Sequence, residues 1–331
     1  MDARFSRRPE NHGVPILQKR RLGRTDLSIA PLVFGGNVFG WTADEKTSFD
    51  LLDRFTDVGL NTIDTADVYS RWVPGNSGGD SETIIGKWMK ARGNRDKIVV
   101  ITKVGADMGQ GKRDLSAGYI EKAVDASLKR LQTDVIDLYL SHWPDDATPY
   151  EETLGAYQKL IAAGKVRHIG ASNLDAGQLG EALKVAKEKN LPRYDVLQPE
   201  YNLYDRPSYD GALRDLCMAE DIGVITYYSL ASGFLSGKYL SEADLAKSAR
   251  GEGVKKYLDA RGLGILAALD AVSARHAATQ AEVALAWIIA RPGVTAPIAS
   301  ATSVAQVDSL IKSVSLKLDQ ADIAELDAAS A

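Results

Sequence analysis

The chain has 331 residues and a hydrophobic content of 45%, enough to bury one large core or two ordinary ones. Its net charge of −4 excludes the strong positive field that nucleic acids and anionic lipids attract, so we expect neither as a partner. The single cysteine, Cys217, excludes an internal disulfide framework and a cysteine metal cluster.

Two further features of the sequence indicate a cytoplasmic protein. The first residues, MDARFSRRPENHG, are partly basic but lack the apolar segment of a secretory signal. The longest purely apolar run, residues 283–290, is far shorter than a membrane-spanning helix. We therefore expect a soluble, cytoplasmic protein without a membrane partner.

The chain begins with a polar arm, residues 1–18, and the segment QKRRLGRTDLSIAPL then predicts a β-hairpin with Gly23 near its turn. Short runs rich in apolar and β-branched residues follow, and they predict strands. In chain order, these strands are expected at residues 31–36, 61–66, 97–103, 135–142, 166–172, 194–201, 223–230 and 294–300.

Amphipathic stretches with the spacing of α-helices separate the strands. Their apolar faces are Phe49, Leu52 and Phe55; Ile120, Val124, Leu128 and Leu131; Leu154, Tyr157, Leu160 and Ile161; Leu179, Leu183 and Ala186; and Leu285, Ile288 and Ile289. Gly164 follows the third stretch and is expected to end that helix, because glycine readily adopts the left-handed conformation found there.

Strand–helix alternation repeated eight times indicates a parallel sheet with helices outside it. Such a sheet can close into a (β/α)8 barrel, or it can stay open and doubly wound. Closure is favoured because no linker or change in composition divides the chain. We therefore predict an α/β protein with a single (β/α)8 TIM-barrel domain over residues 19–331, which begins with the β-hairpin.

Several well-known motifs are absent or incomplete. The dinucleotide motif G-x-G-x-x-G fails at residues 251–256, where Lys256 replaces the third glycine. GFLSGKY (233–239) is one residue too short for a phosphate-binding loop, and Tyr239 stands where Ser or Thr must meet Mg²⁺. GNSGG (75–79) matches the esterase pattern around Ser77, but a loop-like segment precedes it instead of a strand. The four histidines are not spaced as metal ligands, so we expect no metal site.

Polar side chains follow three consecutive predicted strands. Asp64 ends the second strand and Tyr69 lies in the loop beyond it, while Lys103 and His142 end the third and fourth strands. Taken singly, each could be a solvated cap or a packed structural group. In a parallel barrel, however, the carboxyl ends of all strands open on one face. The sequence therefore predicts that these four side chains form one site.

The four groups suit the transfer of a proton. A phenol has a pKa of about 10 and is a weak acid near neutrality. We expect the Lys103 ammonium to lower the pKa of Tyr69, and Asp64 to hold that ammonium charged and in place. His142 can orient a substrate oxygen and share the proton path. Such a phenol could protonate a carbonyl oxygen while the carbon accepts a hydride from a cofactor.

The segments DTADVY, ITK and LYLSHWPD, in this order and spacing, resemble the motifs of the aldo-keto reductases. The resemblance covers Lys19 to Ser330. It implies a (β/α)8 barrel and the NAD(P)H-dependent reduction of an aldehyde or ketone to an alcohol, with the reverse oxidation. It also implies that Tyr69 is the general acid, that Lys103 and Asp64 tune it, and that His142 orients the carbonyl.

The resemblance further implies a site for a nicotinamide cofactor. Ser172 and Asn173 in GASN, with Gln198 in LQPEYN, match residues that hold the carboxamide, although Ser172 or Asn173 could instead be a helix N-cap. Tyr227 matches an aromatic residue that stacks on the nicotinamide ring. The remaining matches are Asp64, Gly36 and Asn37, with Leu230, Gly233, Leu235 and Lys238 around the pyrophosphate.

The sequence departs from the family at the adenine end of this site. In PIASATSVAQVDSLI, Ser300 replaces a glycine and Ser309-Leu310 replace a Glu-Asn pair, while Thr302 and Gln306 are kept. No arginine lies in this segment to bind a 2′-phosphate. Ser300, Thr302 and Gln306 could still hold that phosphate together with Lys238, so we favour NADP(H) over NAD(H).

Four aromatic residues lie in loops that follow the predicted strands: Phe39, Trp41, Trp72 and Trp143. They could wall an apolar pocket for the carbonyl substrate, or they could simply pack the loops. The sequence carries no signal for a particular carbonyl compound or for self-association. The resemblance also extends to cytoplasmic potassium-channel β-subunits, so the alternative function is a nucleotide-binding regulatory subunit with little turnover.

Overall fold

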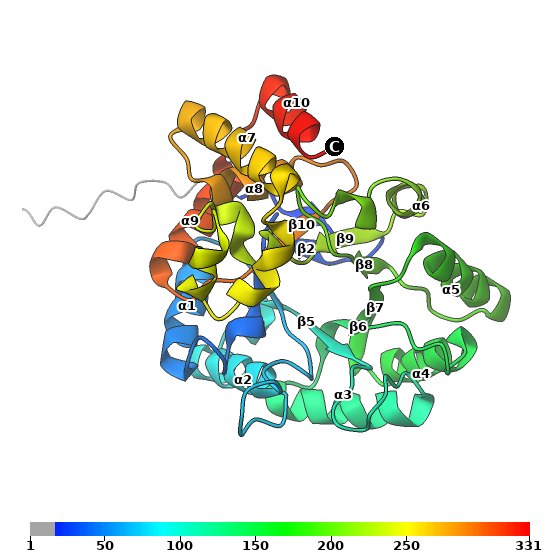
Figure 1. The fold of residues 1–331 in the computed structure, drawn as a ribbon. Helices are drawn as coiled ribbons and strands as arrows, with labels where there is room; N and C mark the ends of the chain where they lie inside the picture. Colours follow the sequence, from blue (N-terminus) through cyan, green and yellow to red (C-terminus); the bar gives the residue numbers. More distant parts are fainter. Residues whose placement is uncertain (1–16) are drawn as a thin grey trace, which may run out of the picture.

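The computed structural model describes residues 17–331, so residues 1–16 of the predicted polar arm lie outside the described part of the chain. Eight parallel strands form a closed barrel, and helices surround it (Figure 1). The predicted α/β barrel is therefore confirmed. Within residues 17–331, no helix has both the length and the hydropathy needed to cross a membrane.

Each barrel strand overlaps one of the predicted runs. In chain order, the strands are β3 (Val33–Gly35), β4 (Thr62–Asp64), β5 (Val99–Val104), β6 (Ile136–Ser141), β7 (Val166–Ser172), β8 (Val196–Gln198), β9 (Gly223–Thr226) and β10 (Ala296–Ala299). Each strand pairs with the next, and β10 closes the barrel on β3 through the parallel pairs Ile298–Val33 and Ala299–Phe34.

The predicted N-terminal hairpin is also present, as β1 (Arg20–Arg21) paired antiparallel with β2 (Ser28–Ile29). Its turn passes close to the amino-terminal end of β9: a β-carbon at Gly23 would lie 2.3 Å from the nitrogen of Gly223. Gly23 also has a φ of +57°, so both its conformation and its surroundings require glycine. The hairpin therefore closes the amino-terminal end of the barrel.

Helices cover the outside of the barrel (Figure 1). The α-helices are α1 (Glu45–Asp57), α2 (Asp80–Arg92), α3 (Ala117–Leu131), α4 (Tyr150–Ala162), α5 (Ala176–Lys189), α6 (Ala212–Ala219), α7 (Ala260–His276), α8 (Gln280–Ile289), α9 (Val304–Ser315) and α10 (Gln320–Ala329). Short 3₁₀ helices are η1 (Gly36–Val38), η2 (Arg95–Lys97), η3 (Arg206–Ser208), η4 (Ala231–Ser236), η5 (Glu242–Lys247) and η6 (Gly251–Tyr257).

Local sequence explains where these helices begin and end. The helix α4 stops just before Gly164, which has a φ of +70° and donates its backbone N–H to the carbonyl of Ile161, as predicted. The helices α5 and α8 begin with capping boxes, in which the side chains of Asp175 and Thr279 accept from the third helical residue.

Apolar side chains fill two regions. Inside the barrel, Val33, Ile101, Leu138 and Ile225 pack together with the hairpin residue Ile29. A larger cluster lies between the barrel and the helices. The barrel interior is therefore a packed core and not a pore, and these side chains support the residues at its carboxyl-terminal rim.

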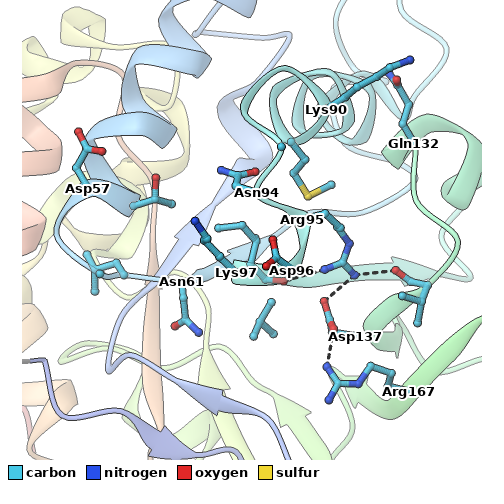
Figure 2. A pocket seen from close by; sticks show the side chains of 18 of the residues that line it. Asp57, Asn61, Lys90, Asn94, Arg95, Asp96, Lys97, Gln132, Asp137 and Arg167 are labelled. Carbon is cyan, nitrogen blue, oxygen red and sulfur yellow. Dashed lines mark hydrogen bonds and ion pairs between the residues drawn. The ribbon is translucent and has the colours of Figure 1, made fainter.

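An open cavity of about 1250 Å³ lies at the amino-terminal ends of β5 and β6, among the segments that follow α1, α2 and α3. Figure 2 shows the carboxylate of Asp137 between Arg95 and Arg167 in this cavity. The two guanidinium groups each lie 2.8 Å from Asp137, and the backbone N–H of Val100 donates to the same carboxylate at 2.9 Å. One buried carboxylate thus joins three neighbouring strands.

We expect Asp137→Ala to lower the free energy of unfolding by about 2 kcal/mol or more, because it removes a carboxylate from two guanidinium groups and leaves the buried N–H of Val100 without its acceptor. The partial exposure of both arginines keeps the loss below that of a fully buried pair. Urea unfolding measures the change. Asp96→Ala is the control, because Asp96 lines the same cavity but is exposed. Equal losses in both variants would contradict the prediction.

Candidate active site

The carboxyl-terminal ends of the barrel strands surround a cavity of about 650 Å³, within the range of small-molecule sites. Each strand, or the residues just after it, places a polar residue at or beneath this rim, as expected for a parallel barrel. In strand order from β3 to β10, these residues are Asn37, Asp64, Lys103, His142, Ser172, Gln198, Tyr227 and Ser300. The cavity also contains Tyr69 from the loop after β4.

The ammonium group of Lys103 lies beneath the cavity floor and is completely buried. Its nitrogen donates to Asp64 Oδ2 at 2.7 Å, to the carbonyl of Thr65 at 2.7 Å and to the hydroxyl of Tyr69 at 2.9 Å. An ammonium has three N–H donors, so each has an acceptor. The structure therefore brings Asp64, Tyr69 and Lys103 together, as the sequence predicts.

Asp64 is held from both sides. Its Oδ2 accepts from Lys103, while its Oδ1 accepts from the side-chain amide of Gln198 at 2.8 Å. The Tyr69 hydroxyl lies 3.4 Å from the same Oδ2, which is long for a hydrogen bond between oxygens. The phenol therefore receives a strong hydrogen bond from Lys103 but gives only a weak one, which leaves its proton free for another oxygen.

The acidity of Tyr69 differs from the sequence-based expectation. Removal from water, followed by the negative charge of Asp64, raises the pKa of Tyr69 well above its usual range, although Lys103 lies beside it. Burial also lowers the pKa of Lys103, against the opposing effect of Asp64. The expectation that Lys103 gives Tyr69 a lowered pKa is thus wrong for this state of the site. Tyr69 is a protonated hydroxyl at neutral pH.

His142 adjoins the phenol as a neutral imidazole. Burial, followed by the positive charges of Lys103 and Arg113, lowers the pKa of His142 well below its usual range. Its ring centroid lies 6.0 Å from that of Tyr69, and its Nδ1 is buried without a hydrogen-bond partner among residues 17–331. A neutral imidazole can donate from one ring nitrogen and accept with the other, so His142 can orient an oxygen near Tyr69.

Hydrogen bonds fix the loop that carries Tyr69. Thr65 donates its hydroxyl to Ser81 at 2.8 Å, and Ser70 donates to the carbonyl of Phe39 at 2.6 Å. Phe39 itself is completely buried and stacks on Phe34 with a centroid distance of 5.4 Å. The prediction that Phe39 walls the substrate pocket is therefore corrected: its ring belongs to the core that supports the loop.

The other predicted pocket aromatics lie near the cavity. Trp72 and Trp143 line it, and Trp72 remains 49% exposed. Trp41 meets Trp72 edge-on at 5.6 Å but does not line the cavity, so its predicted place in the pocket wall is corrected. Trp143 stacks on His142 at 6.0 Å. The entrance beside Tyr69 therefore has flat apolar walls.

Asn173 joins three strands at the neighbouring part of the rim. It has a φ of +62°, a conformation that asparagine tolerates better than most residues. Its amide donates to the carbonyl of His142 at 2.9 Å, and its Oδ1 accepts from the hydroxyl of Tyr227 at 2.6 Å. The N-cap of α5 is Asp175, so the alternative that Ser172 or Asn173 caps this helix is wrong.

A strained backbone segment follows Tyr227. Four residues have positive φ: Tyr228, Ala231, Ser232 and Gly233. Such turns direct successive backbone N–H groups toward one side and favour anions. Leu230, Gly233 and Lys238 line the cavity here, and the Lys238 ammonium would lie 3.5 Å from a β-carbon at Gly233.

Two predicted cofactor residues lie behind the wall rather than on it. The side chain of Leu235 is completely buried in the core. Gly36 packs against Ser81, whose hydroxyl would lie 2.9 Å from a β-carbon at that position. Neither contributes to the lining, whereas Gly35 and Asn37 do.

Arg250 is a site residue that the sequence reasoning missed. Its guanidinium carbon lies 5.4 Å from the centre of the Trp41 ring, and the residue lines the cavity. Its Nη2 is buried without a hydrogen-bond partner, and no ion pair forms on it among residues 17–331. The only signal in the sequence is an arginine in the segment after GFLSGKY, which has no pattern of its own. An unpaired guanidinium in a cavity favours an anionic ligand.

The far end of the cavity contains the residues where the sequence departs from the family. Ser300 donates to Asn37 Oδ1 at 2.6 Å, and the amide oxygen of Gln306 accepts from the backbone N–H of Thr302 at 2.7 Å. Ser309 lines the cavity and donates to Glu282 at 2.9 Å. This end is therefore polar, in contrast to the aromatic entrance beside Tyr69.

This chain resembles known proteins over most of its length. The model of the Aldo/keto reductase family matches residues 31–331. The "Uncharacterized oxidoreductase YrpG" of Bacillus subtilis (strain 168) is 36% identical over 90% of this chain and 91% of its own. "Protein tas" of Escherichia coli (strain K12) is 30% identical over 94% and 97%. A "Probable voltage-gated potassium channel subunit beta" of Arabidopsis thaliana is 33% identical over 90% and 91%.

The acidity of Tyr69 can be measured by titrating phenolate absorbance in the native protein and in Tyr69→Phe. We expect the two curves to coincide up to a pH of about 10, where an unperturbed phenol is half ionised, because the pKa of Tyr69 is raised. N-acetyltyrosinamide provides the reference for an unperturbed phenol. An extra phenolate that forms below this pH only in the native protein would contradict the prediction.

Proposed function

The chain belongs to the aldo/keto reductase family and is an oxidoreductase, and from this premise we propose that it reduces an aldehyde or ketone to an alcohol with a nicotinamide cofactor and also catalyses the reverse oxidation. The observation that supports this most is the Tyr69 hydroxyl, 2.9 Å from a buried ammonium and facing a cavity. When bound, the cofactor supplies the hydride. The residues of the chain then have to place the carbonyl and deliver a proton.

In the proposed reaction, Tyr69 donates its proton to the carbonyl oxygen as negative charge develops there. The Lys103 ammonium stabilises the phenolate that remains, through the hydrogen bond already present. Asp64 keeps the ammonium in position. The neutral imidazole of His142 donates to the same substrate oxygen and fixes its direction.

The raised pKa of Tyr69 bears on the direction of the reaction. A phenol that holds its proton at neutral pH is ready to act as an acid, whereas oxidation of an alcohol needs the phenolate as a base. The reverse oxidation therefore gains more from alkaline conditions than the reduction does. We propose that reduction is the favoured direction near neutrality.

The same cavity offers the polar groups that a dinucleotide requires. Asn173, with Ser172 and Gln198, lies where a carboxamide can be held, and Tyr227 provides a ring beside them. Lys238 and Arg250 supply positive charge for phosphate groups. Two cations favour the more highly charged NADP(H) over NAD(H), as the sequence also suggests.

The proposed substrate is a small carbonyl compound that enters between Trp72 and Trp143, since these rings give the cavity apolar walls beside Tyr69. The proposal also includes a single catalytic domain over residues 19–331 and a cytoplasmic location. Both follow from the sequence, which contains no linker and only one cysteine.

A second candidate function is that of a nucleotide-binding regulatory subunit. The relative in Arabidopsis thaliana whose name contains "voltage-gated potassium channel subunit beta" supports it. Both functions need the nucleotide, but only the enzyme needs sustained turnover. Steady-state reduction of a panel of aldehydes with NADPH distinguishes them, because a regulatory subunit would bind NADPH without appreciable turnover.

We expect Tyr69→Phe to lower kcat for carbonyl reduction by roughly 100-fold or more, since it removes the general acid while it keeps the ring. NADPH binding, measured by fluorescence quenching, should stay within about twofold of the native protein, because the hydroxyl is not needed to hold the nucleotide. Tyr204→Phe is the control, since its hydroxyl bonds to Asp259 away from the cavity. Joint loss of turnover and binding would mean that Tyr69 is structural.

Arg250→Met tests the phosphate-binding part of the proposal. We expect the Kd for NADPH to rise roughly tenfold or more, the cost of losing one charge-assisted hydrogen bond. A separate titration with NADH, which lacks the 2′-phosphate, shows whether the rise in Kd depends on that phosphate. Arg113→Met is the matched control, because Arg113 also lies over a tryptophan, at 4.8 Å from the Trp143 ring, but does not line the cavity. Unchanged NADPH binding in Arg250→Met would remove this residue from the site.

A further inference from the structure

Asp67 is a buried carboxyl that the proposed mechanism does not use. It lies in the loop between Asp64 and Tyr69 and is only 2% exposed. Its backbone N–H donates to the carbonyl of Lys103 at 3.3 Å, so the residue packs against the end of β5. Its Oδ1 is buried without a hydrogen-bond partner among residues 17–331, and no ion pair forms on it there.

The charges around Asp67 are already paired with each other. Glu82 of α2 is completely buried and accepts from Arg130 of α3 at 2.6 Å and from the Thr102 hydroxyl at 2.6 Å. Lys103 of β5 is paired with Asp64. Two cations thus pair with two carboxylates, and Asp67 is a third carboxyl that forms no ion pair among residues 17–331.

The positive charges of Arg130 and Lys103 lower the pKa of Asp67, but each has a smaller effect than the burial of Asp67 or the charge of Glu82. The negative form of Asp67 raises the pKa of three nearby phenols, namely Tyr119 of α3, Tyr139 of β6 and Tyr157 of α4, although burial is the larger cause in each. A buried carboxylate without a partner costs several kcal/mol, so the group keeps its proton instead. Burial, followed by the charge of Glu82, raises the pKa of Asp67 to about 8.

Ionisation of Asp67 acts on Lys103. Burial lowers the pKa of Lys103, and the negative charges of Asp64 and Asp67 both oppose that effect. When Asp67 loses its proton, the field of the new carboxylate therefore favours the charged ammonium. Lys103 therefore remains charged to a higher pH than it would without Asp67.

We propose that Asp67, a buried carboxyl packed against the end of β5 beside Lys103, is a positioning residue whose negative charge in alkaline solution keeps Lys103 charged and Tyr69 supported. This inference rests on the proposed function, because it assigns Asp67 a role through Lys103. Asp67 does not touch the substrate; it acts on the group that stabilises the phenol.

Asp67→Asn tests the protonation state without reference to activity, since asparagine has nearly the shape of a neutral aspartic acid. The pKa of Asp67 is about 8 in the folded protein and about 3.9 in the unfolded chain. A group with a raised folded pKa contributes stability that is lost as pH rises through the folded value. The melting temperature of the native protein should therefore fall relative to that of Asp67→Asn between about pH 5 and pH 8. Above about pH 8, this melting-temperature gap between the two proteins should stay constant.

The pH profile of kcat/KM for aldehyde reduction tests the effect on Lys103. We expect similar rates for the native protein and Asp67→Asn near neutrality, and an alkaline limb that moves to lower pH in the variant by about half a unit or more. Asp107→Asn is the control, because Asp107 lies in an exposed loop where backbone N–H groups of Gly109 and Gly111 lower its pKa. It should move neither measurement in this pH range.

Each outcome decides the proposal. A melting-temperature gap that does not change with pH would show that Asp67 is not protonated and would overturn it. A melting-temperature gap that changes with pH, together with an alkaline limb of kcat/KM that does not move, would mean that Asp67 is a buried acid without influence on Lys103. That outcome would also overturn the proposal. If the native protein turns over no aldehyde, the proposed function fails instead, while the melting experiment still reports on the proton.

Discussion

The buried ammonium of Lys103 is the constraint on which the site depends. A completely buried cation is stable only if each of its donors has an acceptor, and all three acceptors come from one short segment: Asp64, the carbonyl of Thr65 and the hydroxyl of Tyr69. The path of the loop after β4 is therefore tied to one nitrogen atom of β5. The direction of the phenol follows from that path and from the register of the two strands, in which Asp64 pairs with Ile101.

The barrel turns a sequence of separate strand ends into a continuous surface. Gln198 of β8 reaches Asp64 of β4 across the rim, over 134 positions of the chain. Asn173 joins the ends of β6 and β9 in the same way. Such contacts cost little additional entropy because the strands are already fixed by the packed interior. The packed barrel interior thus holds these side chains in place, as the proposed proton transfer requires.

Sequence alone predicts the strands and the Asp-Tyr-Lys-His group, because a parallel barrel gives strand ends one shared destination. It does not give the helix α2, whose buried face includes Ser81 and Glu82 among apolar residues and so breaks the amphipathic pattern. It also misplaces Phe39, since local sequence does not say whether a loop ring turns inward. Arg250 and the raised pKa of Tyr69 depend on distant packing and on the balance of burial against charge, which no short motif encodes.

Two buried carboxyl groups at opposite ends of the barrel differ in the number of cations paired with them. This difference decides whether the group mainly stabilises the barrel or responds to pH. Asp137, at the amino-terminal end, accepts from two guanidinium groups and one backbone N–H, so its charge is fully compensated. Asp67, at the carboxyl-terminal end, forms no ion pair among residues 17–331, and burial raises its pKa to about 8. The first arrangement strengthens the barrel by joining three neighbouring strands. In the role proposed for Asp67, the second arrangement makes the field around Lys103 depend on pH, at the end of the barrel where the proposed proton transfer takes place.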